Sequence, residues 1–396
     1  MFPVLLPALC CLVPAPETPD LAARVDQLVK EGRALLGKGK ANEAARKYQE
    51  AMAVDPKSSW PVSAMADLYH RASEATRPEH VEEYRQQAEA YANRAIDLND
   101  LDYEASRVLG DLRGNPRHSR YAPSAEARQA FEAAEGHFGA GEYDAAREAY
   151  QKALAKDPGY TDAALYLGDC YFAQRRFREA EPFFRKAVGL EPTYGRAWRF
   201  LFDCLYRLER WEDLDRAALD AISAEPDDHA AWGRLRQARE AKGLSGLTRF
   251  HWPTVGRVVP KPGGKGVEIQ VRSIREGQDS LDGALELAVL LVRTACLGDD
   301  PNARKALQLE GASPFQQELK AWSSALAVLR EHSQGGKEPK VDAAWKQVLD
   351  FDRVGHLETA LFLLAFRSDY RRDFEAWKRQ NPKAIGIFVA RFGLRP

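Results

Sequence analysis

The sequence predicts a mainly α-helical protein, an α-solenoid of helix–turn–helix repeats followed by a mostly helical C-terminal domain with a short β-hairpin. Two observations carry this prediction. Pro158, Pro192 and Pro226 each stand 34 residues from the next, and small and aromatic residues recur at fixed distances before them. At Gly243 this regular pattern ends, and glycine, proline and alternating apolar residues follow.

The composition fits a globular protein with more than one domain. The chain has 396 residues, of which 45% are hydrophobic and 29% are charged, and a single core rarely serves so long a chain. Lys and Arg total 57 while Asp and Glu total 58, so the net charge is −1. This balance disfavours a nucleic-acid partner or an anionic membrane. Five cysteines are too few for a disulfide scaffold, and we expect Cys170, Cys204 and Cys296 to be small buried residues.

Residues 1–20 form an apolar leader that we interpret as a signal peptide. The first 16 residues carry no charged side chain and contain four prolines, so a membrane-spanning helix of about 20 apolar residues is disfavoured. Val13-Pro14-Ala15 offers a small-residue cleavage site. We therefore expect export to the periplasm or the extracellular space, with a cytoplasmic location as the alternative. Lipid attachment at Cys10 and a tail without function also stay open.

Residues 21–112 are predicted to form the first part of the solenoid, and its second half is degenerate. A complete repeat spans Val25–Ser58. Another begins at Trp60, but its second helix is delayed to Glu83–Leu98. A further first helix spans Tyr103–Leu112 and lacks a second helix.

Residues 124–242, which follow a predicted loop at 113–123, carry the most regular repeats. The clearest copy spans Thr161–Tyr194, and a helix at Asp228–Ala241 caps the stack. Five residues before each repeat proline, every copy has an alanine: Ala153, Ala187 and Ala221. Agreement at several positions together makes coincidence improbable.

A unit of 34 residues, with small residues where its two helices cross and a proline after the second, resembles the tetratricopeptide repeat. The resemblance covers residues 21–242. Within it, Gly168 or Ala134 lets the two helices approach, while Phe184 or Tyr150 fills the space between them. Each helix pair leaves an apolar edge that only the next pair covers, so the array needs neighbours.

Residues 243–279 are predicted to be a linker with a β-hairpin, and residues 280–396 a helical domain without a recognised family. Thr254–Val259 and Gly266–Ile274 show the alternation of strands. Leu281–Leu297 is apolar on nearly every side, so we expect it to be the buried centre of the domain. Further helices are expected at five places: Pro314–Glu331, Val341–Phe351, His356–Phe366, Asp369–Gln380 and Pro382–Phe392.

No motif in the sequence points to catalysis, a metal or a cofactor. The eight histidines include no His-Glu-x-x-His pair. Residues 262–266 lack the Ser or Thr of a phosphate-binding loop, so we interpret them as a hairpin turn. Residues 243–246 fall one residue short of a serine-nucleophile motif. We therefore expect no catalytic residue and no enzyme activity.

The C-terminal residues 370–396 have two interpretations. Seven basic residues against two acidic ones give this stretch a net charge of +5, and interleaved Phe374, Trp377, Phe388 and Phe392 would suit nucleic acid or anionic lipid. The helical spacing of these rings favours burial against the domain instead, which leaves a solvated basic face.

One face of the first helices is the candidate binding surface. In tetratricopeptide arrays, the residue after the small crossing residue points to the inner surface, and this sequence has acids there. Aromatic residues follow one helical turn later. The candidate groove residues are Glu135, Phe138, Tyr166, Asp169, Phe172, Phe200, Asp203 and Tyr206. The best-known peptide clamp of the family has Asn with Lys or Arg in this place to hold a terminal carboxylate, so the acids disfavour that ligand. A solvated acidic ladder without a ligand is the alternative.

These observations predict a non-catalytic scaffold that binds a protein or peptide partner with basic and apolar side chains. Aromatic anchors would hold the partner in a preformed groove, and the acids would select it. The alternative is that the array positions an enzymatic or receptor domain formed by residues 243–396. A pocket with clustered polar residues in that domain would favour the alternative.

Overall fold

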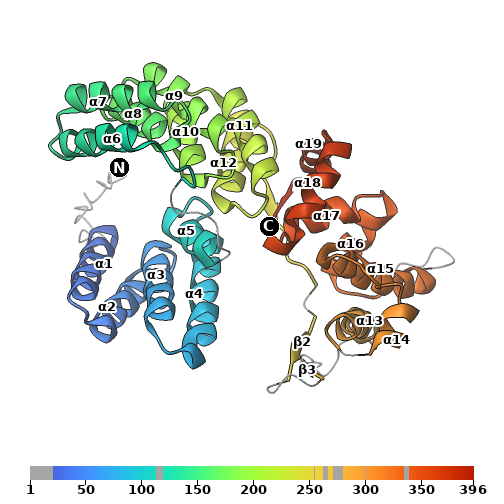
Figure 1. The fold of residues 1–396 in the computed structure, drawn as a ribbon. Coiled ribbons are helices and arrows are strands. Elements are labelled where there is room, and N and C mark those ends of the chain that lie inside the picture. Colours follow the sequence, from blue (N-terminus) through green and yellow to red (C-terminus); the bar gives the residue numbers. More distant parts are fainter. Residues whose placement is uncertain are drawn as a thin grey trace, which may run out of the picture. The chain divides into compact units, whose positions relative to one another are not determined.

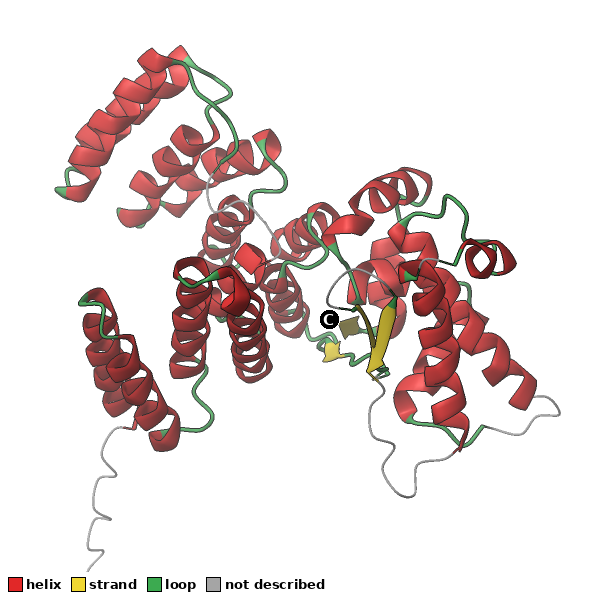
Figure 2. Ribbon diagram, turned by 60° about the horizontal axis from the view of Figure 1, so that its bottom comes forward, coloured by secondary structure: helices red, strands yellow, loops and turns green. Residues whose placement is uncertain are grey.

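A computed structural model describes residues 21–112, 119–253, 255–261, 266–270, 280–298, 300–333 and 339–396. The chain divides into two compact units, Met1–Leu112 and Arg113–Pro396. Helices dominate both units, and the few strands in the second are short (Figure 2). The predicted leader at residues 1–20 lies outside the described residues, as does most of the predicted loop at 113–123.

Within the described residues 21–112, the first unit has two helix pairs and a single helix (Figure 1). Its helices are α1 (Leu21–Gly37), α2 (Ala41–Val54), α3 (Trp60–Ala75), α4 (Pro78–Leu98) and α5 (Tyr103–Leu112). The bounds predicted for α5 are confirmed, whereas α4 begins five residues before the predicted Glu83. Pro78 at the start of α4 explains the difference, because its fixed φ suits the first helical position.

The second unit begins with seven helices that stack in chain order (Figure 1). They are α6 (Ala125–Gly139), α7 (Tyr143–Lys156), α8 (Thr161–Ala173), α9 (Phe177–Leu190), α10 (Gly195–Arg207), α11 (Trp211–Ala224) and α12 (His229–Ala241). Consecutive helices are joined by loops of three to four residues. The predicted helix pairs are therefore present, and α12 lies at the place predicted for the last helix of the array.

Close approach of the two helices in a repeat occurs where the sequence predicts it. A Cβ atom at Gly168 of α8 would stand 2.6 Å from a ring carbon of Phe184 in α9. Ala134 and Tyr150 occupy the same slots in α6 and α7, and both are fully buried. Small residues at the crossing thus let a ring from the second helix fill the space.

The turns that follow α1, α6, α8, α10 and α12 use the same backbone conformation, whereas the turn between α3 and α4 does not. Gly39, Gly141 and Gly243 have φ of 74°, 77° and 71°, and Arg175 and Glu209 have φ of 60° and 54°. Within the second unit these positions stand 34 residues apart. A left-handed residue in this position allows the sharp reversal between the helices, and Gly243 continues the same register.

After α12, the described residues of the second unit form seven helices, a 3₁₀ turn and four short strands. They are β1 (Thr248–Arg249), β2 (Arg257–Pro260), β3 (Val267–Gln270), α13 (Ser280–Leu297), α14 (Pro301–Ala306), α15 (Pro314–His332), α16 (Ala343–Arg353), α17 (Leu357–Leu364), η1 (Ser368–Tyr370), α18 (Arg371–Gln380), α19 (Ala384–Phe392) and β4 (Leu394–Arg395). The antiparallel pair of β2 and β3 is the predicted hairpin. Strand β1 pairs with β4 in parallel.

Helix α13 is not the fully buried centre that its composition predicts. Leu285 and Val289 are buried, but Leu287, Leu291 and Leu297 keep 54%, 56% and 48% of their surface exposed. The helix packs mainly against α15, with the hairpin and α14 also in contact. Neighbours on only part of the circumference leave an outer apolar face, so apolar residues on every side did not indicate complete burial.

One continuous hydrophobic core runs from α8 to α19 and crosses residue 243 without interruption. The C-terminal rings belong to it, since Phe374, Trp377 and Phe388 are buried as their spacing predicts. Two cations of the basic stretch are bound rather than solvated. Arg371 donates to the carbonyl oxygen of Ala224 at 2.6 Å, and Lys378 donates to that of Ser223 at 2.8 Å.

Candidate partner-binding groove

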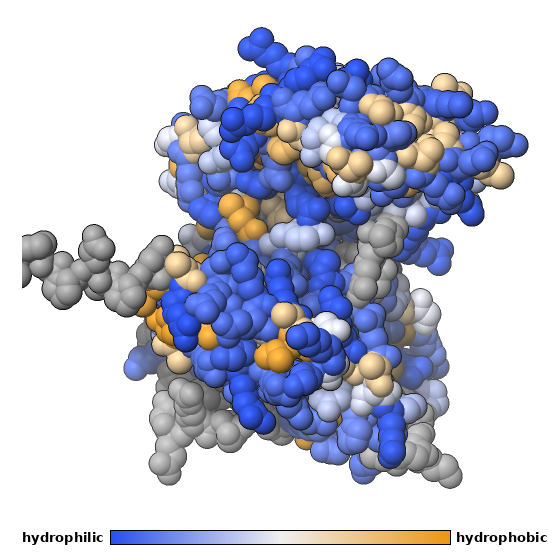
Figure 3. All heavy atoms as spheres, turned by 90° about the vertical axis from the view of Figure 1, so that its left-hand side faces the viewer, coloured by the Kyte–Doolittle hydropathy of each residue, from blue (hydrophilic) through white to orange (hydrophobic). Residues whose placement is uncertain are grey.

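The predicted groove residues lie on the first helices of three successive repeats. Glu135 and Phe138 belong to α6, Tyr166, Asp169 and Phe172 to α8, and Phe200, Asp203 and Tyr206 to α10. On the face of the molecule in Figure 3, apolar residues form small groups within a hydrophilic surface.

In three repeats, an aromatic ring of the first helix packs against the second helix. These rings belong to Phe138, Phe172 and Tyr206. Each ring packs edge-to-face on the first aromatic side chain of the following helix. The pairs are Phe138 with Tyr143 (5.4 Å between ring centres), Phe172 with Phe177 (5.0 Å) and Tyr206 with Trp211 (5.4 Å). All three rings retain accessible surface, and Tyr206 has the most, with 38% exposed. They are both packing elements and partly open surfaces.

Tyr166 and Phe200 form a second, deeper layer of rings. Tyr166 stacks on Tyr150 at 6.0 Å, and Phe200 packs against Phe184 at 5.5 Å. The guanidinium of Arg196 lies 5.0 Å from the centre of the Tyr166 ring and 5.9 Å from that of Phe200. A cation between two rings gains from both quadrupoles, so Arg196 connects α8 to α10.

Asp169 and Asp203 meet arginines from the following first helix. Asp203 forms an ion pair with Arg234 of α12, whereas Asp169 lies in the field of Arg196 and Arg199 of α10. Burial raises the pKa of the Asp169 carboxyl from 3.8 to about 6, against the opposing effect of the two arginines. Burial also raises the pKa of Asp203, and Arg234 counteracts it. Desolvation thus outweighs charge pairing at both carboxyls.

Glu135 occupies the same slot in α6 but has a different partner. Its carboxylate accepts a hydrogen bond from the hydroxyl of Tyr150. Burial, followed by this hydrogen bond, raises the pKa of Tyr150 well above its usual range. Glu135 is itself exposed, so it combines a fixed position with access to solvent.

Acids on the first helices of the other unit also pair with arginines. Asp67 of α3 binds Arg107 of α5 and accepts a hydrogen bond from Arg71 at 2.7 Å. Arg107 also pairs with Asp111 at 2.7 Å. Pairing of an acid with an arginine of the next first helix is therefore common to both units. Sequence spacing alone does not predict these arginine partners, because the pairing depends on how neighbouring first helices are rotated.

The C-terminal region holds a cavity of about 420 Å³ beside α13, α14 and α15, lined by Cys296, Arg304, Glu310 and Gln317 among others. The Arg304 guanidinium donates to the carbonyl oxygens of Ala295, Cys296 and Gly298. It therefore provides hydrogen-bond donors for carbonyl groups at the C-terminal end of α13, which have no partner within the helix. Cys170 and Cys204 are buried as predicted, and Cys296 is half-buried.

Two kinds of feature are absent from the residues that the structure describes. No group of three or more His, Cys, Asp or Glu side chains in this part of the chain could hold a metal ion. Within the same ranges, none of the helices has the length and apolar character needed to cross a membrane.

Comparison with known proteins identifies the repeat. The tetratricopeptide repeat family matches residues 131–195, which span the end of α6 to the start of α10. Comparison with curated proteins gives no match.

Several solved structures are similar to parts of the chain. The first tetratricopeptide domain of Spaghetti (RPAP3), bound to an HSP90 peptide, is 24% identical and covers 31% of this chain and 99% of its own, with a TM-score of 0.28. The TPR2AB domain of yeast Sti1 in complex with pHSP90 is 12% identical. It covers 56% of this chain and 100% of its own, with a TM-score of 0.28. YrrB, described as a protein with an unusual peptide-binding site, is 15% identical. It covers 57% of this chain and 98% of its own, with a TM-score of 0.22. The helix pairs within residues 131–195 match the tetratricopeptide repeat, and the C-terminal region is not assigned to a family.

Proposed function

We propose that the protein is a non-catalytic scaffold that binds a segment of a partner protein in the groove lined by α6, α8 and α10. Solenoids of this kind use extended concave surfaces for binding. The observation that carries the proposal is the row of Phe138, Phe172 and Tyr206, which occupy one slot in three successive repeats with part of each ring open. Such rings hold apolar side chains and cations.

The charges in the groove favour a partner that also has basic side chains. Asp203 is occupied by Arg234, so it contributes little to an incoming cation. Asp169 has no hydrogen bond or ion pair to another described residue, and Glu135 is exposed beside Phe138. A Lys or Arg of the partner would therefore bind near Glu135 and Asp169, with an apolar side chain on the neighbouring ring.

The test is partner capture by groove variants of the full chain. Tyr206→Ala combined with Asp169→Ala should weaken binding by about 1 kcal/mol or more if this surface is a hot spot. The melting temperature should change little, because Tyr206 is the most exposed ring of the row. The control is Gln151→Ala on an exposed position of α7, which should bind like the parent.

The partner is first identified by pull-down with the full chain and mass spectrometry, and the affinity is then measured with the purified partner. Undiminished affinity of the double variant at full stability would refute the groove. A large fall in melting temperature would show that the ring belongs to the core.

The alternative function, an enzymatic or receptor domain positioned by the array, depends on the polar residues around the cavity near Cys296. Arg304 is engaged with backbone carbonyls there, so the most polar group of that cavity serves the fold. This arrangement favours the scaffold over the alternative.

We also propose that the chain is exported, to the periplasm or the extracellular space. The support is the uncharged, apolar leader at residues 1–20. Expression in a secreting host should give a mature protein without about the first 15–20 residues, as read by mass spectrometry. An intact Met1 on the product would favour the cytoplasmic alternative.

A further inference from the structure

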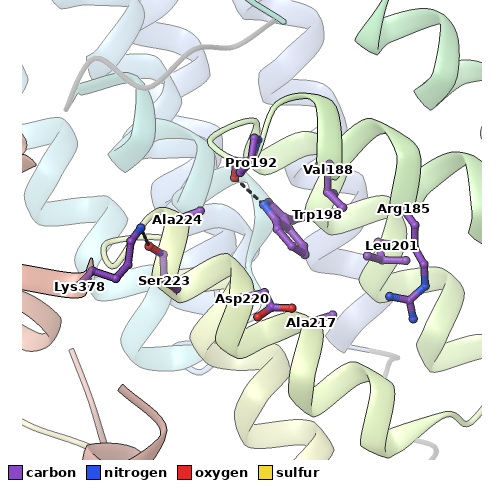
Figure 4. Close-up of a pocket in the computed structure, with 11 residues that line it drawn as sticks. Arg185, Val188, Pro192, Trp198, Leu201, Ala217, Asp220, Ser223, Ala224 and Lys378 are labelled. Atoms are coloured by element: carbon purple, nitrogen blue, oxygen red, sulfur yellow. Dashed lines mark hydrogen bonds between the residues drawn. The ribbon is translucent and has the colours of Figure 1, made fainter. Parts of the chain in front are cut away.

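A second site lies away from the groove, at a cavity of about 370 Å³ between α9, α10 and α11 (Figure 4). Its apolar wall is formed by Val188, Trp198, Leu201 and Ala217. The indole N–H of Trp198 donates to the carbonyl oxygen of Pro192 at 2.7 Å, which fixes the ring. The volume falls in the range of ligand pockets, about 300–1,000 Å³.

The charged groups of this cavity are Asp220, Arg185 and Lys378. Both cations already have acidic neighbours, since Arg185 binds Glu181 at 2.8 Å and Lys378 binds Glu375 at 3.0 Å. Among the described residues, no hydrogen bond or ion pair reaches the Asp220 carboxylate. Asp220 is therefore the charged lining residue whose side chain is not already held in an ion pair.

The environment of Asp220 favours an incoming cation. Asp220 is exposed to solvent; partial desolvation still raises the pKa of its carboxyl, and the charges of Arg216 and Arg185 partly counteract this effect. A cationic group in contact with the carboxylate would stabilise its charged form. Lys and Arg side chains combine such a group with an apolar stem, which suits a wall of Trp198 and Leu201.

On both sides of the cavity, other segments of the same chain contact the ends of the second helices of the repeats. An acid stands directly before the proline at the end of α7, α9 and α11: Asp157, Glu191 and Glu225. Asp157 accepts hydrogen bonds from Tyr121 and from the backbone of Ser124, and Glu191 accepts them from Ser119 and the backbone of Arg120. Glu225 binds Arg371 of α18. The cavity lies between the last two of these contacts, because Pro192 and Ala224 line it.

We propose that this cavity binds a Lys or Arg side chain of a polypeptide segment from a partner protein, with the cationic head at Asp220 and the stem against Trp198 and Leu201. The segment would continue the path that the chain's own residues follow on this edge. The site is distinct from the groove of α6, α8 and α10, so each can be tested without the other.

The probe is a set of blocked pentapeptides that differ only in the central residue, which is Lys, norleucine or Glu. The full chain is labelled with fluorotryptophan, and Trp198→Phe assigns the resonance of Trp198 among the eight tryptophans. The Lys peptide should shift this resonance in a saturable manner. The norleucine and Glu peptides should bind about fivefold more weakly, the difference expected of one partly exposed ion pair.

Two variants locate the site. Asp220→Asn should weaken the Lys peptide about fivefold and bring it to the level of norleucine. Gly189→Leu should abolish the shift, because Gly189 lines the cavity and a Cβ atom there meets no neighbour within 4 Å. The matched control is Gly139→Leu, at an equally open position near the end of α6, which should bind like the parent.

Three results would overturn the proposal. Equal binding of the norleucine peptide would identify an apolar pocket, and preference for the Glu peptide would assign the site to Arg185 and Lys378. A Trp198 resonance that does not respond to the Lys peptide, in protein with unchanged melting temperature, would show that the cavity takes no such side chain.

Discussion

At the scale of single residues, Gly168 allows close helix packing because it has no side chain. A Cβ atom would stand 2.6 and 2.8 Å from two ring carbons of Phe184 and 3.2 Å from Cβ of Phe183, and both rings come from the packed helix α9. Gly168→Ala should therefore lower the free energy of unfolding by about 1–3 kcal/mol, as overpacked core positions do. Urea unfolding measures the change.

The control for this prediction is Gly136→Ala in α6, where a Cβ atom meets no neighbour within 4 Å. This variant should gain about 0.5–1 kcal/mol from better helix propensity. If Gly168→Ala is as stable as Gly136→Ala, the helices at this crossing can separate without cost, and close approach is not the reason for the glycine.

Asp169 gives the groove a pH dependence. Its pKa is raised from 3.8 to about 6 in the folded chain, mainly by burial. The folded state therefore binds the proton more tightly than the unfolded state, and the stabilisation is complete below the unfolded pKa. It is lost as the pH rises through about 6.

In Asp169→Asn this contribution is absent. The difference in free energy of unfolding between parent and variant should therefore change between pH 4 and pH 6 in favour of the variant, as measured by urea unfolding at several pH values. A difference that is constant over this range would show that the carboxyl is hydrated like one in an unfolded chain.

At the scale of elements, the turns within the repeats contain strain that a substitution can remove. Arg175 and Glu209 adopt φ of 60° and 54°, where the other repeats have glycine. The left-handed conformation costs a side chain about 1–2 kcal/mol, and the greater freedom of unfolded glycine offsets part of the gain. Arg175→Gly should therefore raise the free energy of unfolding by about 0.5–1 kcal/mol.

Arg178→Gly provides the matched control, because Arg178 is exposed within helix α9. It should lose about 1 kcal/mol of stability through poorer helix propensity. Thermal unfolding measures both variants. If Arg175→Gly loses as much stability as Arg178→Gly, the contacts of the Arg175 side chain stabilise the fold by more than its left-handed backbone conformation costs.

The elements with repeated or periodic signals could be predicted from the sequence. Tyr103–Leu112 and the helix pairs of residues 124–242 follow from glycine, alanine and proline at fixed spacing. Helix α14 was not predicted, because six residues are too few to show a period. The β1–β4 pair was not predicted either, since two residues at each end of a long segment carry no pairing signal.

The candidate groove divides in the same way. That Phe138, Phe172 and Tyr206 share one slot follows from the 34-residue spacing alone. Their packing on the next aromatic side chain, and the pairing of Asp203 with Arg234, depend on how neighbouring helices are rotated. Sequence spacing within one helix does not contain that rotation, so the arginines became visible only in the folded chain.

At the scale of the whole chain, the array and the C-terminal helices of the second unit share one hydrophobic core. An ion pair reinforces this junction: Arg371 of α18 binds Glu225, which is 6% exposed at the end of α11. A core shared from α8 onward predicts that residues 161–242 and 280–396 unfold together, although the sequence places a boundary between them.

Arg371→Ala tests this coupling, because it leaves Glu225 buried without its cation and removes a donor from the carbonyl of Ala224. The free energy of unfolding should fall by about 1–3 kcal/mol. Arg371→Ala combined with Glu225→Ala should recover part of the loss, since the unpaired charge is gone. Arg372→Ala, an exchange of the neighbouring basic residue, is the control.

In calorimetry of Arg371→Ala, the transition of the second unit should move to lower temperature as a single peak. Two separate peaks would show instead that the array and the C-terminal helices fold independently and that the common core contributes little to their stability.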